Sequence, residues 1–337
     1  ARLLTPLSEA MSKPLLEIKN LRVSIVPRLN KKPVYPVRKL SLRIDKGKTL
    51  ALVGESGCGK SMTCLAISGL LPKRAEISRG KIRLSGKNIL KMKRKRAREF
   101  RRKHLSMIFQ DATNSLNPVH SIGWQVAEAI KLRSGVKWKV AIEEAESLLS
   151  LVGMPNPKRA LKAYPHEFSG GMNQRAMIAL AMAGNPKLLI ADEATTALDV
   201  TIQSQILDLL CSLQEKFQTS ILFVTHDLGI VAEIADSVTV MYAGCVVESG
   251  PTDEVFDSPI HPYTSSLLSS LPRIDRVSSR LPVIPGVVPA IDDMPSGCSF
   301  DPRCDYSMPC CNDNFPNITI TKQRSFACFN PIEHLRT

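Results

Sequence analysis

The sequence predicts an α/β fold built on a parallel sheet, and three apolar segments of strand length support this prediction. They lie at 50–53, 188–191 and 220–224, and each is followed by a segment that favours a helix. Short buried strands that alternate with helices are typical of parallel sheets covered by helices. Ligands bind such sheets beyond the carboxyl ends of the strands. The residues that follow the three segments are therefore the first candidates for a functional site.

Length and charge limit the remaining possibilities. The chain has 337 residues, which allows one large domain with an appendage or two domains. Its longest apolar run, at 176–183, is much shorter than the roughly 20 residues of a membrane-spanning helix, so we expect a soluble body that can still associate with a membrane. The net charge of +14 favours an anionic partner such as a nucleotide, a nucleic acid or lipid headgroups.

The strand at 50–53 leads directly into the strongest motif of the chain. Residues 54–61, GESGCGKS, follow the pattern G-x-x-x-x-G-K-S, and a helix is expected at 62–71. Glycines let successive N–H groups converge on phosphate oxygens, the lysine reaches the β- and γ-phosphates, and the serine hydroxyl coordinates Mg²⁺. Both flanks have the expected structure, which favours a nucleotide site over a chance glycine turn. The predicted nucleotide-binding residues of this segment are Gly54, Ser56, Gly57, Cys58, Gly59, Lys60, Ser61 and Met62.

A second anion site and a pair of acids are predicted farther along the chain. A turn of small residues runs into a helix, whose free N–H groups and dipole favour an anion. This turn consists of Ser169, Gly170 and Gly171. The apolar strand at 188–191 then ends in Asp192 and Glu193. An anion-binding helix start close to two carboxylates suggests phosphate chemistry with a metal ion.

Three further polar or aromatic residues lie where a nucleotide site could use them. Tyr35, in a basic loop between two strands, is either a strand-edge aromatic residue or a platform for an adenine ring. Gln110 follows a predicted strand and can offer its amide oxygen to a metal ion or a water molecule. His226 follows the strand at 220–224, and this position favours a phosphate-facing role over that of a capped core histidine.

The segment 91–103 is strongly basic, because nine of its thirteen residues are Lys or Arg. Such a run is usually the solvated face of a helix. Only one aromatic residue, Phe100, interrupts it, which argues against stacking on nucleic-acid bases. We therefore expect a solvated helix, with contact to anionic lipid as the lesser alternative.

Taken together, the motifs resemble those of the ATP-binding cassette (ABC) ATPases over about residues 15–250. The motifs are, in order, the loop at 54–61, Gln110, the turn at 169–171, the acids Asp192 and Glu193, Asp199, and His226. The resemblance implies a P-loop NTPase (RecA-like) α/β core with an antiparallel β subdomain and an α-helical subdomain. The ABC-type ATPase domain would span 14–255, with the helical subdomain at about 111–185, and a small cysteine-containing C-terminal extension would span 256–337.

The resemblance also implies a role for each motif residue. Tyr35 would stack on adenine, and the loop at 54–61 would hold the phosphates. The metal ligands would be Ser61, Gln110 and Asp192, holding Mg²⁺. Glu193 would polarise the attacking water, and His226 would contact the γ-phosphate.

Other motif residues would act on a second cassette. Ser169, Gly170 and Gly171 would bind the γ-phosphate of the nucleotide held by the opposite subunit, and Asp199 would lie at the dimer interface. The chain departs from the family pattern at two places: Met172 stands where Gln is common, and Ala194 stands where many relatives have Pro. Neither departure removes a chemical group from the expected site.

The end of the chain resembles the C-terminal region of dipeptide/oligopeptide importer ATPases, a region that nickel and antimicrobial-peptide-resistance transporters share. The resemblance rests on HPYTSSLL at 261–268, PGVVP at 285–289 and PRC at 302–304. Four cysteines fit the pattern that holds a [4Fe–4S] cluster in such relatives. They are Cys298, Cys304, Cys311 and Cys328. Two alternatives are a zinc site and a set of cysteines packed as small apolar residues. Either Cys310 or Cys311 could be the third ligand, and we choose Cys311 on spacing.

These resemblances imply an ATP-hydrolysing, energy-coupling subunit of an importer for di- or oligopeptides, peripheral on the cytoplasmic face of the cell membrane. Its partners would be two permease subunits, a second ABC ATPase that is identical or homologous, and indirectly an extracytoplasmic substrate-binding protein, with no nucleic acid. Nickel or antimicrobial peptides are alternative substrates. A soluble cassette protein acting on nucleic acid or ribosomes is disfavoured, because the chain has one cassette and no sustained heptads in the 109 residues from Lys60 to Ser169.

Overall fold

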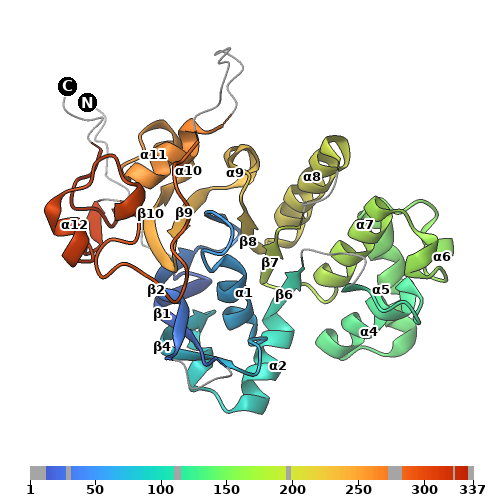
Figure 1. Cartoon of the computed structure of the whole chain (residues 1–337). Coiled ribbons are helices and arrows are strands. Elements are labelled where there is room, and N and C mark those ends of the chain that lie inside the picture. The colour runs from blue at the N-terminus through green and yellow to red at the C-terminus, as the bar shows by residue number, and fades with distance from the viewer. Residues whose placement is uncertain are drawn as a thin grey trace, which may run out of the picture.

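The computed structural model describes residues 13–27, 32–109, 115–194, 199–271, 283–321 and 323–332. In this part of the chain a twelve-stranded mixed sheet runs through the molecule, and a separate group of helices lies at one end (Figure 1). No helix in these ranges is both long and apolar enough to cross a bilayer.

The parallel part of the sheet has the strand order β9-β3-β8-β7-β6. Its strands are β3 (Thr49–Val53), β6 (Leu105–Ile108), β7 (Leu188–Asp192), β8 (Ser220–Thr225) and β9 (Ser237–Tyr242). Every residue of β3, β7 and β8 is buried, which explains their continuous apolar sequences. Val53 pairs with Thr225, and Asp192 pairs with Val224. The carboxyl ends of β3, β8 and β7 therefore lie side by side at one edge of the sheet.

An antiparallel group of strands continues the sheet beyond β9. It contains β1 (Leu16–Ile25), β2 (Val34–Ile44), β4 (Ala75–Leu84) and β5 (Lys87–Asn88), and β2 joins it to β10 (Cys245–Pro251). The strand β4 was not expected from the sequence, because charged residues and a glycine interrupt its apolar positions. Its pairing with β1 is set by tertiary structure rather than by local sequence.

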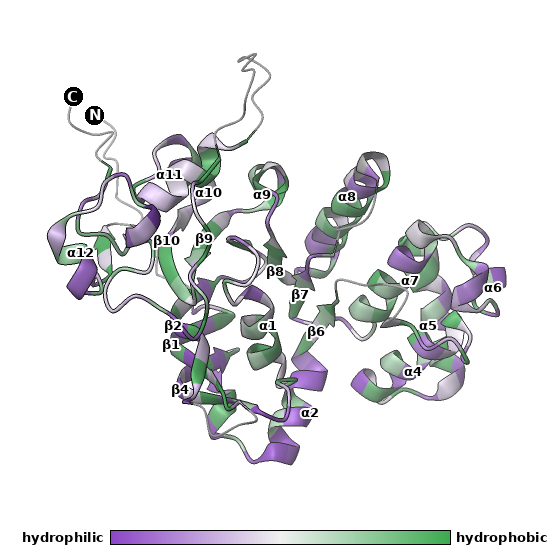
Figure 2. Cartoon of the chain, viewed as in Figure 1, coloured by the Kyte–Doolittle hydropathy of each residue, from purple (hydrophilic) through white to green (hydrophobic). Residues whose placement is uncertain are grey.

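Four helices pack around the parallel strands. They are α1 (Lys60–Ser68), α2 (Arg94–His104), α8 (Val200–Phe217) and α9 (Leu228–Ile234). The basic run forms α2, in which only Ala97 is buried, and Figure 2 shows this helix as strongly hydrophilic. The side chain of Arg101 is held in place, because its Nε donates a hydrogen bond to the carbonyl oxygen of Ile67 at 3.0 Å. The basic run is therefore a solvated helix face, as the sequence predicts.

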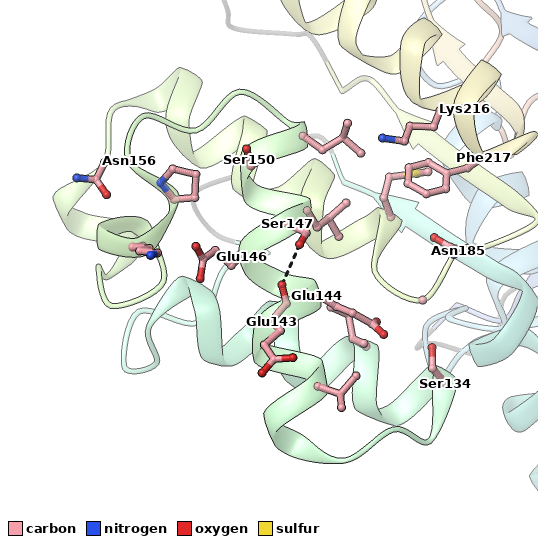
Figure 3. Close-up of a pocket in the computed structure, with 18 residues that line it drawn as sticks. Ser134, Glu143, Glu144, Glu146, Ser147, Ser150, Asn156, Asn185, Lys216 and Phe217 are labelled. Carbon is pink, nitrogen blue, oxygen red and sulfur yellow. Dashed lines mark hydrogen bonds between the residues drawn. The ribbon is translucent and has the colours of Figure 1, made fainter.

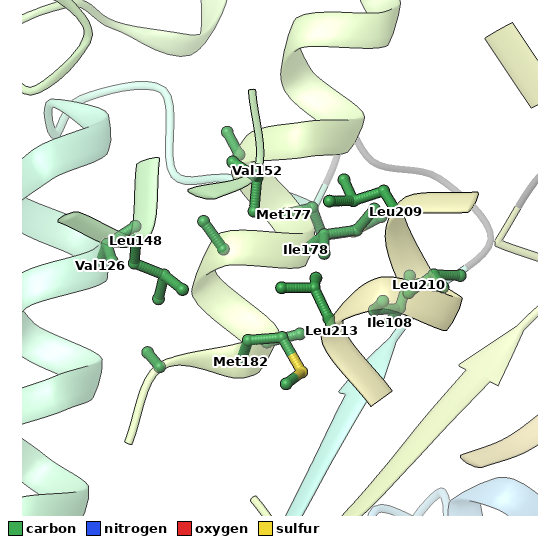
Figure 4. Packing of buried hydrophobic residues seen from close by; sticks show 14 of the residues in the cluster. Ile108, Val126, Leu148, Val152, Met177, Ile178, Met182, Leu209, Leu210 and Leu213 are labelled. Atoms are coloured by element: carbon green, nitrogen blue, oxygen red, sulfur yellow. The ribbon is translucent and has the colours of Figure 1, made fainter. Parts of the chain in front are cut away.

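The helical group contains α4 (Ile122–Ser134), α5 (Trp138–Leu151), α6 (Pro157–Ala160) and α7 (Gly170–Met182). In Figure 4 its buried side chains from α4, α5 and α7 form one core with side chains of α8 and β6. The labelled members are Ile108, Val126, Leu148, Val152, Met177, Ile178, Met182, Leu209, Leu210 and Leu213. This shared core fixes α7 against the helix that follows β7.

The C-terminal segment packs on β9 and β10 and adds two strands, β11 and β12, to the sheet. Its elements are α10 (Thr252–Asp257), α11 (Pro262–Ser269), η3 (Asp301–Arg303), α12 (Pro309–Asp313), β11 (Thr319–Thr321) and β12 (Arg324–Phe326). β12 pairs antiparallel with β10. Tyr263 and Phe300 share a hydrophobic cluster with Tyr242 of β9. The C-terminal segment therefore has part of its core in common with the main sheet. Two short 3₁₀ segments, η1 (Ile89–Lys91) and η2 (Pro165–Glu167), complete the described elements.

Candidate nucleotide site

The glycine-rich loop at 54–61 connects β3 to α1 and lies against neighbouring backbone. Gly54 has φ 150° and Gly59 has φ 102°, a range that L side chains rarely adopt. A Cβ atom on Gly54 would lie 2.1 Å from the carbonyl oxygen of Met241, and one on Gly59 would lie 2.2 Å from that of Pro36. Both positions therefore require glycine, which lets the loop approach β2 and β9 closely.

Positive charge is concentrated where the loop enters the helix. Lys60, only 5% exposed, donates hydrogen bonds from Nζ to the carbonyl oxygens of Gly54 at 2.7 Å and Glu55 at 3.0 Å. The first turn of α1 contains no acidic side chain, and no side chain caps its N-terminus. An ammonium group and uncapped N–H groups at a helix start form a site suited to phosphate.

Ser61 connects the loop to the acidic end of β7. Its hydroxyl donates a hydrogen bond to Oδ1 of Asp192 at 3.2 Å. Asp192 is buried, and this burial raises its pKa, although the Ser61 hydrogen bond opposes the shift. A serine hydroxyl beside one carboxylate fits Mg²⁺, which proteins usually bind through one or two carboxylates together with substrate phosphates and water.

Glu193 and His226 meet at the same edge of the sheet. Glu193 has φ 49°, an unusual value for a residue other than glycine, and its N–H donates to the carbonyl oxygen of Val224 at 2.9 Å. Its Oε1 lies 3.6 Å from Nδ1 of His226. Left-handed backbone at a strand end, held by a neighbouring strand, is a form of strain that is common at active sites. A carboxylate in this position can accept a proton from a water molecule.

Tyr35 lies inside β2 and not in the preceding loop that the sequence predicts for it. The guanidinium carbon of Arg22 is 3.7 Å from the centroid of its ring. One face of the ring is thus covered by a cation–π contact. An adenine ring could stack only on the opposite face.

The predicted Ser-Gly-Gly anion site and the predicted interface residue Asp199 lie at neighbouring helix starts. Ser169 caps α7, and its Oγ accepts a hydrogen bond from the N–H of Met172 at 3.4 Å. Asp199 caps α8 by accepting one from the N–H of Ile202 at 2.9 Å. A Cβ atom on Gly171 would lie 3.4 Å from Cγ2 of Ile202, so the two starts are close together.

The Ser-Gly-Gly turn is separate from the glycine-rich loop of the same chain. Figure 1 shows α7 in the helical group and α1 in the central part of the molecule. Within the described ranges, no hydrogen bond or ion pair joins residues 169–171 to residues 54–61. Gln110, the other predicted ligand of the metal ion, lies outside the described residues.

Gln174 was not anticipated from the sequence. This side chain of α7 is 4% exposed, and its Nε2 donates a hydrogen bond to the carbonyl oxygen of Ala194. Ala194 directly follows Glu193, so the helix that starts with the Ser-Gly-Gly turn touches the segment that carries the acid. The sequence offered one indication of this contact, a polar residue at a helix position expected to be buried. It did not indicate which group the Gln174 side chain would bind.

A pocket of about 1200 Å³ lies between the helical group and the end of α8, and none of these residues lines it (Figure 3). Its lining includes Asn185, which precedes β7, and Phe217, which precedes β8. These positions are at the amino ends of the strands, whereas the glycine-rich loop follows the carboxyl end of β3. Glu143, Glu144 and Glu146 also line the pocket, and their charge disfavours a polyphosphate.

The four cysteines chosen as ligands are neighbours in the C-terminal segment. The N–H of Cys298 donates to the carbonyl oxygen of Cys311 at 2.8 Å. Burial raises the pKa of Cys328 to about 12, and the charges of Cys298, Cys304 and Cys311 act in the same direction. Burial likewise raises the pKa of Cys304 to about 11, with Cys298 and Cys311 adding to the shift. In the described ranges, however, no three His, Cys, Asp or Glu side chains are grouped so that they could hold a metal ion.

Similarity to known proteins agrees with this geometry. Residues 37–196 match the ABC transporter family, and residues 247–311 match the oligopeptide/dipeptide transporter C-terminal region. The chain is 44% identical over 321 residues to the oligopeptide transport ATP-binding protein OppD of Salmonella typhimurium, covering 95% of each chain. It is 47% identical over 317 residues to the oligopeptide transport ATP-binding protein AppD of Bacillus subtilis, covering 94% of this chain and 96% of the relative.

The fold is similar to that of solved ABC transporter cassettes. The structure of cbiO1 from Clostridium perfringens, part of the ABC transporter complex cbiONQ, has a TM-score of 0.62 at 27% identity and covers 72% of this chain and 91% of that one. The predicted P-loop NTPase fold is thereby confirmed. Because the sequence similarity extends over nearly the whole length of both chains, the protein belongs to the ABC transporter family as an ABC-type ATPase, among the ATP-binding subunits of the oligopeptide/dipeptide type.

Proposed function

We propose that this ATPase energises the import of di- or oligopeptides. The contact between Ser61 and Asp192 carries the ATPase part of the proposal, because it joins the glycine-rich loop to the acidic strand end in one site. The similarity to the oligopeptide transport ATP-binding proteins OppD and AppD, at 44% and 47% identity over most of the chain, supports peptides as the substrate.

Within one chain, the residues at the carboxyl edge of the sheet bind and activate ATP. Lys60 moves from the carbonyl oxygens of Gly54 and Glu55 to the β- and γ-phosphates, and the N–H groups of the loop surround the phosphate oxygens. Ser61 and Asp192, with Gln110, hold Mg²⁺, which neutralises charge on the phosphates when bound. Glu193 orients the attacking water and accepts its proton, while His226 contacts the γ-phosphate.

Across two chains, the turn at 169–171 completes the site of the partner cassette. The N–H groups of Gly170 and Gly171 at the start of α7 bind the γ-phosphate of the partner's ATP, and Asp199 lies at the interface. Each nucleotide is then held between two cassettes, which close only when ATP is present. Closure moves two attached permease subunits, and an extracytoplasmic binding protein delivers the peptide. The partner cassette is either a second copy or a homologous ATPase.

This function implies a position on the cytoplasmic face of the membrane, held there by the permeases. The ATPase domain at 14–255 includes the helical subdomain at about 111–185, and the extension at 256–337 includes the cysteines. The boundary at 255/256 separates the proposed ATPase motifs from the cysteine-bearing segment. It does not separate two hydrophobic cores, because the extension shares core residues with β9.

Purification of the tagged chain from membranes tests the proposed function. We expect two permease subunits and a second ABC ATPase to co-purify, and we expect the reconstituted complex to take up di- or oligopeptides only with hydrolysable ATP. A Lys60→Met chain should assemble equally well and support no uptake. A complex that transports another substrate class but no peptide, or a chain that purifies without permeases, would contradict the proposal.

We also propose that Cys298, Cys304, Cys311 and Cys328 hold a [4Fe–4S] cluster. The hydrogen bond from the N–H of Cys298 to the carbonyl oxygen of Cys311 supports the proposal, and thiolates are the ligands of such clusters. The bound cluster would stabilise the thiolate forms, which burial in the cluster-free chain disfavours. The four thiols are not grouped as metal ligands in the described residues, so cluster binding requires them to rearrange.

Anaerobic purification tests the cluster. We expect brown protein with broad visible absorbance, and iron and sulfide in stoichiometric amounts. Cys304→Ser should lose the colour, whereas Cys310→Ser should keep it and Cys211→Ser serves as a control away from the extension. Colourless protein with stoichiometric zinc would replace the iron–sulfur assignment by a zinc site.

A further inference from the structure

The C-terminal extension contacts the glycine-rich loop directly, at Glu55. The hydroxyl of Tyr263 accepts a hydrogen bond from the N–H of Glu55 at 3.0 Å. Nη1 of Arg303 lies 3.0 Å from both carboxylate oxygens of the same residue. Glu55 is therefore held by its main chain and by its side chain, and both contacts come from residues more than 200 positions later in the sequence.

The Arg303 guanidinium is fixed by several further hydrogen bonds. Its side chain is 5% exposed. Nε donates to the carbonyl oxygen of Pro285 at 2.8 Å, Nη2 to that of Ile284 at 3.4 Å, and Nη1 to the hydroxyl of Tyr242 at 3.3 Å. A planar guanidinium with acceptors on all three nitrogens has essentially one orientation. It can therefore act as a rigid support for Glu55.

Tyr263 is equally well fixed. Tyr242 and Tyr263 are fully buried, with ring centroids 4.7 Å apart. The ring of Phe300 packs edge-on against both, at 5.2 Å from Tyr242 and 5.3 Å from Tyr263. Aromatic rings packed in this way place the Tyr263 hydroxyl at a defined point beneath the loop.

The contacts at Glu55 affect two properties that phosphate binding requires: the conformation of the loop and the charge near the phosphates. The carbonyl oxygen of Glu55 accepts a hydrogen bond from Lys60 at 3.0 Å, and this bond is lost when Lys60 turns to the phosphates. The bonds from Arg303 and to Tyr263 do not involve Lys60 and can persist. In addition, Glu55 is the only acidic residue in the loop at 54–61, so its unpaired carboxylate would repel a nearby polyphosphate.

We propose that Arg303 and Tyr263 are positioning residues for ATP binding. Through them the C-terminal extension holds the glycine-rich loop in its phosphate-binding shape and offsets the charge of Glu55. Since Arg303 directly precedes Cys304, the same contact links the cysteine-bearing segment to the nucleotide site. The inference rests on ATP binding and does not depend on the identity of the transported substrate or on a metal cluster.

A double-mutant cycle on the purified chain tests the proposal, with the Kd for ATP as the readout. Arg303→Met should raise the Kd about tenfold, which corresponds to about 1.4 kcal/mol, because it leaves the Glu55 carboxylate unpaired beside the phosphates. In the Glu55→Gln background the same change should raise the Kd by much less, since no unpaired carboxylate remains. Arg303→Lys should bind ATP more tightly than Arg303→Met, because lysine restores the positive charge, but less tightly than the wild type, because it lacks the planar guanidinium with its several donors.

The control is a second ion pair of the extension that does not touch the loop. Arg324 donates from Nη2 to Oε1 of the buried Glu248 at 2.6 Å. Arg324→Met should lower the melting temperature and leave the Kd for ATP unchanged. If Arg303→Met does not fold, Tyr263→Phe, which removes one hydroxyl, should still raise the Kd.

Three results would overturn the proposal. The first is an unchanged Kd in Arg303→Met, or in Tyr263→Phe if that variant has to replace it. The second is an equal rise caused by Arg303→Met with and without Glu55→Gln. The third is an equal rise in Arg324→Met, which would mean that any damage to the extension weakens ATP binding.

Discussion

Glu193→Gln is expected to bind ATP with unchanged affinity and to hydrolyse it at least about a hundredfold more slowly, the usual range for loss of a general base. The amide has nearly the size of the carboxylate, so the left-handed turn at 193 and the bond from its N–H to the carbonyl oxygen of Val224 can be kept. An amide cannot accept the proton of the attacking water. The ATPase rate of the assembled complex and the Kd for ATP of the isolated chain measure the two effects separately.

Glu143→Gln is the matched control for this variant. Glu143 is an exposed carboxylate of α5 that lines the pocket at the opposite edge of the sheet. Its replacement should leave both the ATPase rate and the affinity unchanged. A Glu193→Gln enzyme that turns over at the wild-type rate would remove Glu193 from the role of base.

Gly59→Ala is expected to weaken ATP binding by more than about a hundredfold. A forced backbone shift or overpacking can cost roughly 3 kcal/mol, which corresponds to a change of this size in the Kd. The added Cβ would lie 2.2 Å from the carbonyl oxygen of Pro36 and 2.9 Å from Cε of Met241. The contact with Met241 can relax by side-chain movement, but the contact with Pro36 is to the backbone of β2. The loop must therefore move away from β2 and lose the position in which its N–H groups converge.

The matched control for this variant is Gly86→Ala. Gly86 has φ 76° in the turn between β4 and β5, and a Cβ atom there would meet no atom within 4 Å. This change introduces left-handed strain without a clash, at a cost of about 1–2 kcal/mol in stability, and should leave the Kd for ATP unchanged. Equal ATP affinities of the two variants, measured by equilibrium binding at matched temperature, would show that the close approach to Pro36 does not matter.

Much of the core and of the candidate site could be predicted because both are local in sequence. The strands β3, β7 and β8 are buried on both faces and so have continuous apolar sequences. Each catalytic candidate in the described ranges lies one or two residues beyond such a strand, or in the loop that follows it. Parallel pairing then brings these positions to the same edge, as the contacts Ser61–Asp192 and Glu193–His226 show.

The features that were missed depend on partners that are distant in sequence. Arg303 and Glu55 are 248 positions apart in the sequence, and no sequence motif predicts that they form an ion pair. The contact of Gln174 with the carbonyl oxygen of Ala194 is also a tertiary feature. β4 is a strand because β1 pairs with it, although its own sequence alternates poorly. The resemblance predicted that the four cysteines would form one ligand set, but in the described residues they are not grouped as metal ligands.

The central claim is that the Ser-Gly-Gly turn serves the nucleotide of the opposite cassette and not that of its own chain. Gly170→Asp tests this claim well, because a Cβ atom at residue 170 meets no atom within 4 Å and an acid near a helix start does not disturb the helix. The added carboxylate would repel a γ-phosphate wherever the turn meets one.

The decisive measurement is the Kd for ATP of the isolated chain at a concentration at which it is monomeric. The account predicts that Gly170→Asp binds ATP as tightly as the wild type, whereas Lys60→Met loses binding; in the assembled complex both variants should fail to hydrolyse ATP. A monomeric Gly170→Asp chain whose ATP affinity falls as far as that of Lys60→Met would contradict the account, because the turn would then bind the nucleotide of its own chain.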